Sequence, residues 1–407
     1  MSERLFTPRF FIMCAYTFTV FVSVFQLLPT APYHVLDLGG STTAAGLFLG
    51  FLTYSSAISA PFTGSIGDRI GQRRVLITVS LILSAFSASY AFIDDHRVLL
   101  GVVIVHGLFW SGLLTASGAY MTSTLPPSRR AEGLGYWGLA SVVAVGAAPV
   151  IGFWVYSQGW TALCVEITTL NLLMAVIAWR LPDDHHGAHG REAASGAAPD
   201  AAAVHAPHHH IEWRVLVLSI GLALISFAYG SLTSFSALYA DWLHISPRSL
   251  FLSAMAVSML LSRLLLGRSL DRIGHRRVLL RCLVIPPVGL AVLAFANGPV
   301  MFAIAAMIFG VGFGLMHPAF TAYVMNHVSF ARRGAAYGAM IAAFDTGIGT
   351  GSSVMGWLVH HVGYRPAFAL TAALAALSLP SFLLAEGRLG FRDLAEPRPA
   401  RSEEARQ

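Results

Sequence analysis

The sequence predicts an all-α membrane protein whose twelve transmembrane helices form two pseudo-symmetric halves of six helices each. Three observations lead to this fold class: the composition, the number of long apolar stretches and a tandem repeat. Of the 407 residues, 56% are hydrophobic and 11% are charged, and the mean hydropathy is +0.66. Soluble domains carry about 25% charged residues. A chain of this size with so few charges lacks the polar surface of a soluble protein. The three cysteines all lie in apolar stretches, which excludes a secreted disulfide scaffold.

The long apolar stretches give the number of membrane crossings. A helix needs about 20 apolar residues to cross a bilayer, because lipid offers no hydrogen-bond partner to exposed backbone groups. Windows of this length predict twelve spans, at 10–30, 44–64, 75–93, 98–121, 133–156, 161–180, 214–237, 249–267, 276–296, 299–325, 335–361 and 364–385. The first span is not a signal peptide, since eleven more follow and no small-residue cleavage site is evident.

The basic residues predict the orientation of these spans. The formal net charge is +6, and all 26 basic residues are arginines. If the N-terminus is cytoplasmic, only Arg97, Arg248 and Arg365 fall outside the cell, and Arg263 lies within a span. This asymmetry follows the positive-inside rule. It explains the basic charge without nucleic acid, and it predicts a multi-pass inner-membrane protein with both termini in the cytoplasm.

Two loops of the same pattern show that the chain is a tandem repeat. Each reads Gly-x-x-x-Asp-Arg-x-Gly-x-Arg-Arg, and the copies are 203 residues apart. The fixed residues of this pattern are Gly64, Asp68, Arg69, Gly71, Arg73 and Arg74 in the first loop, and Gly267, Asp271, Arg272, Gly274, Arg276 and Arg277 in the second. The same offset pairs Gly107 with Gly310 and Tyr120 with Tyr323. Six spans per copy give both halves the same orientation, which makes this a parallel repeat.

The repeat divides the chain into four parts. Residues 1–180 and 214–385 form the two six-helix halves, and 386–407 is a charged tail with the composition of a disordered segment. Residues 181–213 form a cytoplasmic linker rich in Ala, Pro and Gly. The linker holds seven histidines: His185, His186, His189, His205, His208, His209 and His210. Imidazoles bind Zn²⁺, Ni²⁺ or Cu²⁺, but their spacing here is not that of a structural site. We therefore predict neither a metal site nor a cofactor.

The doubled loop and the twelve spans in two halves closely resemble the major facilitator superfamily (MFS), and the resemblance covers almost the whole chain. It implies the MFS fold, a monomer that carries a small molecule, and loops that act as a latch closing one access state. The small residues Gly64 and Gly267 permit close helix approach. Gly71 and Gly274 suit a chain reversal with positive φ.

The span at 133–156 carries Gly146, Pro149 and Gly152, which are similar to the Gly-x-x-Pro-x-x-Gly bend of the proton-coupled exporters in this superfamily. This resemblance favours export over import. Exporters of this group often carry an arginine three residues before a Gln-Gly pair in the fourth span. Here Val103 replaces that arginine and His106 replaces the glutamine. The usual charge relay of the group is therefore missing from this span.

Ionisable residues within spans are costly and mark functional sites by default. Asp345 is the strongest candidate for proton coupling, because Gly349, Ser352 and Ser353 follow it on one small-residue helix face. The alternative is a structural carboxylate that is hydrogen-bonded within the bundle. Glu166 is a second candidate, unless it reaches water at the periplasmic end of its span. Arg263 has a structural interpretation, by snorkelling to the interface or pairing with the Asp271 loop.

Other polar residues are candidates for the substrate cavity. The resemblance places His106 and His317 on helices that line the central cavity, where each is a candidate for proton coupling or for substrate binding. The alternative for both is a hydrogen-bonded packing residue. Gln26, Tyr229 and Asn326 are further cavity candidates.

The sequence has no Walker loop, so an ATP-driven pump is disfavoured, and nothing in it resembles an enzyme. The main hypothesis is a secondary transporter that exports a small, amphipathic molecule in exchange for protons by alternating access. A uniporter, an importer or a sugar exporter of the same superfamily is the first alternative. A metal-responsive membrane sensor that uses the histidine-rich linker is an alternative from another class. Deleting 185–210 separates the last two classes, because a transporter keeps its flux and a sensor loses its response.

Overall fold

The computed structural model describes residues 5–126, 129–182, 213–328 and 333–389, and within these ranges the chain is helical apart from short turns. The first half consists of α1 (Pro8–Asp37), α2 (Thr42–Ile70), α3 (Gln72–Tyr90), α4 (His96–Thr124), α5 (Arg130–Tyr156) and α6 (Trp160–Trp179). Thr7, Ser41 and Asp95 cap α1, α2 and α4 with side-chain oxygens that accept backbone N–H groups of the first turn.

The second half repeats this order with two interruptions. It consists of α8 (Trp213–Leu218), α9 (Ile220–Trp242), α10 (Leu250–Ile273), α11 (His275–Ala294), α12 (Pro299–His327), α13 (Arg333–Val362), α14 (Tyr364–Ala376) and α15 (Ser378–Arg388). The spans predicted at 214–237 and 364–385 are therefore each two helices, broken at Ser219 and at Leu377. The second break has a local cause, since Pro380 has no N–H to bond the carbonyl of Ala376.

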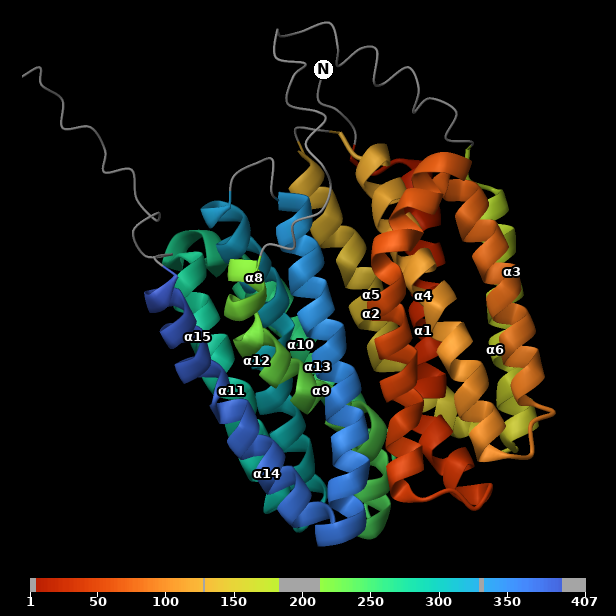
Figure 1. Ribbon diagram of the computed structural model, residues 1–407, viewed down its shortest axis with the longest axis vertical. Coiled ribbons are helices and arrows are strands. Elements are labelled where there is room, and N and C mark those ends of the chain that lie inside the picture. Colours follow the sequence, from red (N-terminus) through yellow and green to blue (C-terminus); the bar gives the residue numbers. More distant parts are fainter. Residues whose placement is uncertain (1–4, 127–128, 183–212, 329–332, 390–407) are drawn as a thin grey trace, which may run out of the picture.

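The helices form two bundles that stand side by side (Figure 1). In the first half α1 packs on α5, α2 on α4 and α3 on α6. In the second half α9 packs on α13, α10 on α12 and α11 on α14, which is the same pairing. The two halves meet through α2 with α13 and through α5 with α10, with a smaller contact between α1 and α9. We call this surface the seam.

The predicted count of twelve membrane crossings agrees with this arrangement. Nine of the described helical stretches are long and apolar enough to cross a membrane, and α10 adds a shorter apolar stretch, Leu250–Leu266. The two remaining spans, α3 and α13, are less apolar, because α3 begins with arginines and α13 carries many Gly, Ser and Thr residues.

The tandem repeat extends to the helix contacts. A Cβ on Gly107 would overlap the hydroxyl oxygen of Ser55 and the carbonyl oxygen of Leu52. A Cβ on Gly310 would overlap the same atoms of Ser258 and Met255, which lie at the same sequence offset. In each half, therefore, a glycine of the fourth span allows close approach to the second span.

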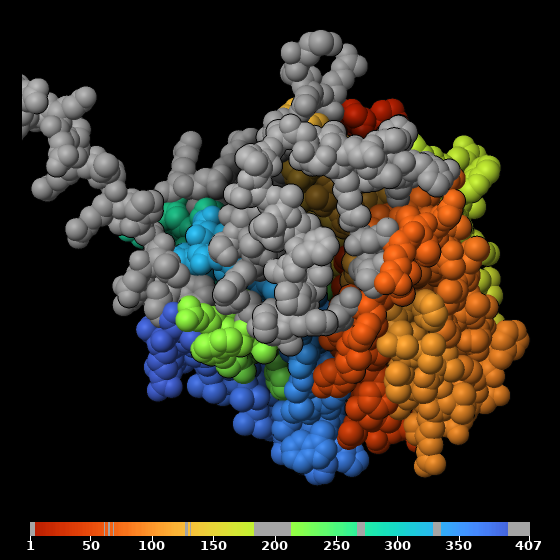
Figure 2. Space-filling model, turned by 45° about the horizontal axis from the view of Figure 1, so that its top comes forward, coloured from red at the N-terminus to blue at the C-terminus, as the bar shows by residue number. Residues whose placement is uncertain are grey.

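The two ends of the bundle differ in charge. We call the end that holds the α2–α3 and α10–α11 turns, with Arg73 and Arg276, the arginine-rich end. The opposite end holds the turns at 38–41, 157–159 and 243–249. The two halves converge at the opposite end in Figure 1. Figure 2 shows the molecule with the arginine-rich end turned forward.

The predicted linker and tail fall largely outside the described residues. All seven linker histidines are outside them, as is the tail beyond Leu389. The predicted tail begins at Glu386, whereas α15 continues to Arg388 and buries Glu386 to 1% exposure. Membrane-domain structure therefore extends past residue 385. Among the described residues, no group of three His, Cys, Asp or Glu residues is placed to hold a metal ion.

Candidate functional site

The two copies of the repeated loop have the same geometry. Gly71 and Gly274 both end the preceding helix with φ of 92° and ψ of 136°. The predicted positive φ is thereby confirmed at both positions, and side chains other than glycine rarely adopt it. Arg69, Arg74 and Arg277 are exposed at the arginine-rich end. The side chains of Asp68, Asp271 and Arg272, and the surroundings of Gly64 and Gly267, lie outside the described part of the structure.

One arginine of each loop binds the last span of its own half. Arg73 donates from Nη2 to the carbonyl oxygen of Trp179 at the end of α6, over 2.7 Å. Arg276 binds both carboxylate oxygens of Glu386 in α15, at 2.7 and 2.8 Å. Such bidentate pairs are the strongest hydrogen bonds between side chains. The contacts hold each turn against its own half, so they do not bridge the seam.

Glu386 was not among the residues that the sequence singled out. Besides Arg276, its Oε1 accepts the hydroxyl of Tyr323 over 2.7 Å. The corresponding tyrosine of the first half, Tyr120, donates to the carbonyl oxygen of Pro182 over 3.3 Å. The repeat offset pairs Arg73 with Arg276 and Tyr120 with Tyr323. It was the available signal that a hydrogen-bond acceptor for Arg276 and Tyr323 follows the twelfth span.

The bonds from Arg276 and Tyr323 explain why the carboxylate of Glu386 is tolerated at a buried position.

The glycine and proline residues of α5 place that helix between two neighbours. A Cβ on Gly146 would lie 3.1 Å from the Cβ of Ala256 in α10, across the seam. A Cβ on Gly152 would lie 2.9 Å from the Cβ of Gln26 in α1, within the first half. Pro149 lines a small apolar space at the seam, together with Phe25, Pro29, Val145, Tyr229, Thr233, Leu252 and Met255. Gly146 and Pro149 of the α5 motif therefore lie at the seam, whereas Gly152 packs on α1 within the first half.

The small-residue face of α13 is the face that packs on α2. Ser352 donates its hydroxyl to the carbonyl oxygen of Gly46 over 2.7 Å. A Cβ on Gly349 would lie 2.5 Å from the hydroxyl oxygen of Thr53. The hydroxyl of Tyr54 also donates across the seam, to Thr350 over 3.0 Å. The stripe that follows Asp345 is thus turned toward the other half of the molecule.

Asp345 lies one turn before Gly349 on this stripe, on the side toward the arginine-rich end. It is half-buried. Among the described residues it forms no hydrogen bond and no ion pair. The alternative interpretation, a structural carboxylate hydrogen-bonded within the bundle, therefore has no supporting partner among the described residues. A carboxylate without a counter-ion at mid-helix is costly, and that cost falls when the carboxylate takes up a proton.

Two further candidates lie at the aromatic contact between α9 and α12. Tyr229 is 7% exposed and stacks on Phe313, with ring centroids 4.4 Å apart. His317 contacts the ring of Phe344 edge-on, with centroids 5.5 Å apart. Arg263, on α10, lies within electrostatic reach of both Tyr229 and His317. Tyr229 and His317 thus share one region with Arg263.

Arg263 hydrogen-bonds a helix backbone inside the second half. It neither snorkels to the interface nor pairs with a carboxylate among the described residues. Instead, its Nε donates to the carbonyl oxygen of Gly314 in α12 over 2.9 Å. The side chain of Arg263 thus lies against α12 and the seam, and the Asp271 loop with which it was expected to pair lies outside the described residues.

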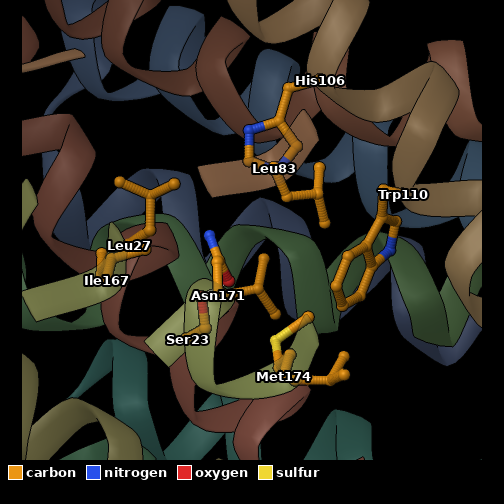
Figure 3. A pocket seen from close by; sticks show the side chains of 10 residues that line it. Ser23, Leu27, Leu83, His106, Trp110, Ile167, Asn171 and Met174 are labelled. Atoms are coloured by element: carbon orange, nitrogen blue, oxygen red, sulfur yellow. Dashed lines mark hydrogen bonds between the residues drawn. The ribbon is translucent and has the colours of Figure 1, made fainter. Parts of the chain in front are cut away.

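His106 lies inside the first half, away from the seam. It is 4% exposed, and its Nδ1 shares a hydrogen bond of 2.8 Å with the hydroxyl of Tyr90 in α3. It lines a cavity of about 10 Å³ within α1, α3, α4 and α6 (Figure 3), which is roughly the space of one water molecule. Next to this cavity, Asn171 accepts from Ser23 and donates to Ser87, over 2.7 and 2.8 Å. The expectation that His106 lines the central cavity is therefore wrong.

Gln26 and Glu166 bind one another within the first half. Nε2 of Gln26 donates to Oε1 of Glu166 over 3.1 Å. Gln26 is fully buried, and both Oε1 of Gln26 and Oε2 of Glu166 are buried without a hydrogen-bond partner. Glu166 therefore does not simply reach water, and Gln26 contacts α5 and α6 of its own half. Asn326 is exposed one residue before the end of α12, so it too is not a central-cavity residue.

Side chains of both halves meet again at the opposite end. Tyr33 of α1 donates its hydroxyl to Oδ2 of Asp241 in α9 over 3.0 Å. Arg248 binds the other oxygen of Asp241 over 2.9 Å, and its guanidinium lies 5.0 Å from the centre of the Tyr33 ring. We call these three residues the opposite-end clasp. The clasp joins the two halves where the seam is closed.

Replacing Tyr33 with phenylalanine is expected to loosen this end. The ring and its contact with Arg248 remain, but the hydrogen bond to Asp241 is lost, which costs about 1.5 kcal/mol for a charged acceptor. The population open at this end should rise about tenfold. Spin labels at Gln158 and Ser246, in a variant without native cysteines, report the change as a longer distance. Tyr156→Phe is the matched control, because Tyr156 donates to Asp37 within one half. Equal distances in all variants would show that the clasp does not hold the halves together.

Comparison with known proteins agrees with this architecture. The family model described as Major Facilitator Superfamily matches residues 9–328 and 218–406. An uncharacterized MFS-type transporter of Pseudomonas aeruginosa is 28% identical over 386 residues, covering 89% of each chain. The Staphylopine export protein of Staphylococcus aureus is 22% identical over 382 residues, covering 91% of this chain and 92% of the relative.

A solved structure shows the same fold. The crystal structure of a bacterial homolog to the human lysosomal transporter Spinster, in an inward-facing and occupied conformation, has a TM-score of 0.75. It is 14% identical in sequence and covers 95% of this chain and 98% of that structure. At this identity the likeness concerns the fold alone.

Proposed function

Because the chain belongs to the Major Facilitator Superfamily, we propose that this transporter exports a small amphipathic molecule in exchange for protons, with Asp345 as the proton-coupling residue. The half-buried carboxyl of Asp345, without a partner among the described residues, carries the proposal. Asp345 lies on the α13 face that packs on α2, so movement between the halves changes its surroundings. Its protonation state and the position of the halves are therefore expected to depend on each other.

The direction of transport rests on two observations. The α5 motif, which resembles the bend of proton-coupled exporters, lies at the seam with Gly146 against Ala256. In addition, one relative across nine-tenths of the chain is described as an export protein. We propose that the arginine-rich end, with both termini, faces the cytoplasm. In this orientation the opposite-end clasp closes the periplasmic side.

Two features support an amphipathic substrate. The space at the seam is lined mainly by apolar side chains of α1, α5, α9 and α10. The polar groups near it are few: the hydroxyls of Tyr229 and Thr233, and beyond them the Arg263 guanidinium and the His317 ring. A sugar needs several hydrogen-bond partners, so this lining favours an amphipathic solute over the alternative of a sugar.

Liposomes that contain the purified protein and trapped pyranine, a pH-sensitive dye, test the coupling. Solutes are added singly from a panel of amphipathic anions, cations and neutral molecules, with and without an imposed pH gradient. A transported solute should shift the internal pH, and a pH gradient should drive the solute against its own concentration gradient. Solute counterflow that does not respond to the gradient would identify a uniporter. Absence of movement for every solute under every gradient would contradict transport itself.

A further inference from the structure

We propose that Arg263 binds a carboxylate group of the transported molecule. The inference rests on the proposed transport of a small molecule along the seam. It names the class of substrate as small molecules that join one carboxylate to an apolar or aromatic part.

The first step is that Arg263 has unused donors. A guanidinium has five N–H donors, and the structure assigns one hydrogen bond to it, from Nε to Gly314. None of the described Asp or Glu side chains forms an ion pair with it. A charged residue within a span is costly unless it is paired or serves a function. A ligand bound at the seam would supply such a partner.

The second step is that the guanidinium reaches the seam. Arg263 belongs to α10 of the second half, and its Nη1 lies 3.9 Å from the position of a Cβ on Gly138 in α5 of the first half. Because Gly138 has no side chain, the space beside Nη1 is not filled from the facing helix. A ligand bound to Nη1 and Nη2 would thus lie between the two halves, where alternating access requires the substrate to bind.

The third step concerns what lies beside this charge. Tyr229, Phe313 and Phe344 form a row of rings, with centroids 4.4 Å apart for the first pair and 6.3 Å for the second. Phe344 in turn contacts His317. Arg263 lies beside this row, because its Nε donates to the carbonyl oxygen of Gly314, the residue that follows Phe313 in α12. The row offers an apolar surface on which a ring or aliphatic part of a ligand packs.

The choice of a carboxylate follows from charge and geometry. A guanidinium matches a carboxylate with two parallel hydrogen bonds. A phosphate monoester carries up to two negative charges near pH 7, and among the described residues of this region Arg263 is the only permanent cation. One positive charge beside aromatic rings fits a monocarboxylate with an apolar part better than a phosphate.

Binding at equal pH, without any gradient, tests this site separately from coupling. The probes are phenylacetate and indole-3-acetate, with phenylacetamide and indole-3-acetamide as neutral analogues of the same shape. Thermal stabilisation of the purified protein is expected with both carboxylates, and it should be weaker by at least tenfold in dissociation constant with the amides. Arg263→Gln should lose this preference, and Arg263→Lys should retain part of it. Arg281→Gln, at an exposed position of α11, is the matched control and should bind as the wild type does.

A second measurement needs no ligand. If Arg263 were structural, Arg263→Gln would lower the melting temperature of the free protein. If it awaits a ligand, the melting temperature should stay equal or rise, because removing an unpaired buried charge relieves its desolvation cost. The proposal is overturned by a fall of several degrees, by equal affinity for acid and amide, or by the absence of stabilisation with both acids. Carboxylate binding that persists while no proton-driven flux occurs would instead refute the proposed coupling and leave this site standing.

Discussion

Asp345→Asn is expected to abolish proton-driven transport. Exchange of substrate between the two sides of the membrane should remain intact. Asparagine keeps the size and most of the hydrogen-bonding capacity of the carboxyl group but takes up no proton near neutral pH. The structure gives Asp345 no hydrogen bond or ion pair among the described residues, so its replacement should cost little stability. Any functional loss would then arise from the missing titration. We expect at least a tenfold decrease in the rate of pH-gradient-driven flux and less than a twofold change in solute counterflow.

Two other acidic residues serve as controls for Asp345→Asn: one outside the seam and one inside the bundle. Asp94→Asn, at an exposed turn of the opposite end, should leave both rates unchanged. Glu166→Gln tests the other acidic candidate, whose Oε1 already accepts from Gln26. Undiminished proton-driven flux in Asp345→Asn would refute the role of Asp345, and a selective loss in Glu166→Gln would transfer that role to the first half.

Gly351→Ala is expected to destabilise the second half more than any polar substitution considered above. A Cβ at this position would overlap the carbonyl oxygen of Phe227 in α9. Backbone atoms cannot rotate away, so α13 and α9 would have to separate, at a cost of about 3 kcal/mol. The contact is also the place where Ser231 donates its hydroxyl to the carbonyl oxygen of Gly351 over 3.0 Å. Separation of the helices would weaken this hydrogen bond too.

The melting temperature and the monodisperse fraction of the purified protein measure this effect. We expect a clear decrease in both for Gly351→Ala. Gly338→Ala is the matched control in the same helix, because a Cβ there meets no atom within 4 Å, and alanine favours helix by about 1 kcal/mol over glycine. Its melting temperature should be unchanged or slightly higher. Equal melting temperatures for the two variants would mean that α9 and α13 do not pack as closely as the structure shows.

Much of the fold follows from the sequence, because its signals are local or repeated. A stretch of about 20 apolar residues has few stable alternatives to a transmembrane helix. The repeat predicts that the second half has the same structure as the first. The contacts of Gly107 with Ser55 and of Gly310 with Ser258, which lie at the same sequence offset, confirm this. Helical spacing also placed Asp345 on the small-residue face of its helix, and that face is the one that packs on α2.

The candidate site was predicted less completely, because a span shows which residues share a helix face and not which neighbour that face meets. His106 seemed to face the cavity but hydrogen-bonds Tyr90 within the first half. Arg263 was assigned to the interface because it lies one turn before the repeated loop, yet its side chain reaches α12 and the seam. The charged composition of 386–407 places Glu386 in the tail, and its partner Arg276 is too distant in sequence, by 110 residues, for a local pattern to reveal the pair.

The sequence by itself determined that this chain is a duplicated twelve-span membrane protein with a carboxyl group inside its eleventh span. Hydrophobic length, charge asymmetry and internal repetition encode those properties directly. Only the tertiary structure decided which charged side chains have partners. Pairing depends on how each helix is rotated about its axis and on which helix lies opposite. The packing of all the helices together fixes both the rotation and the facing helix. It pairs Glu386 with Arg276 and leaves Arg263 and Asp345 without an ion pair among the described residues.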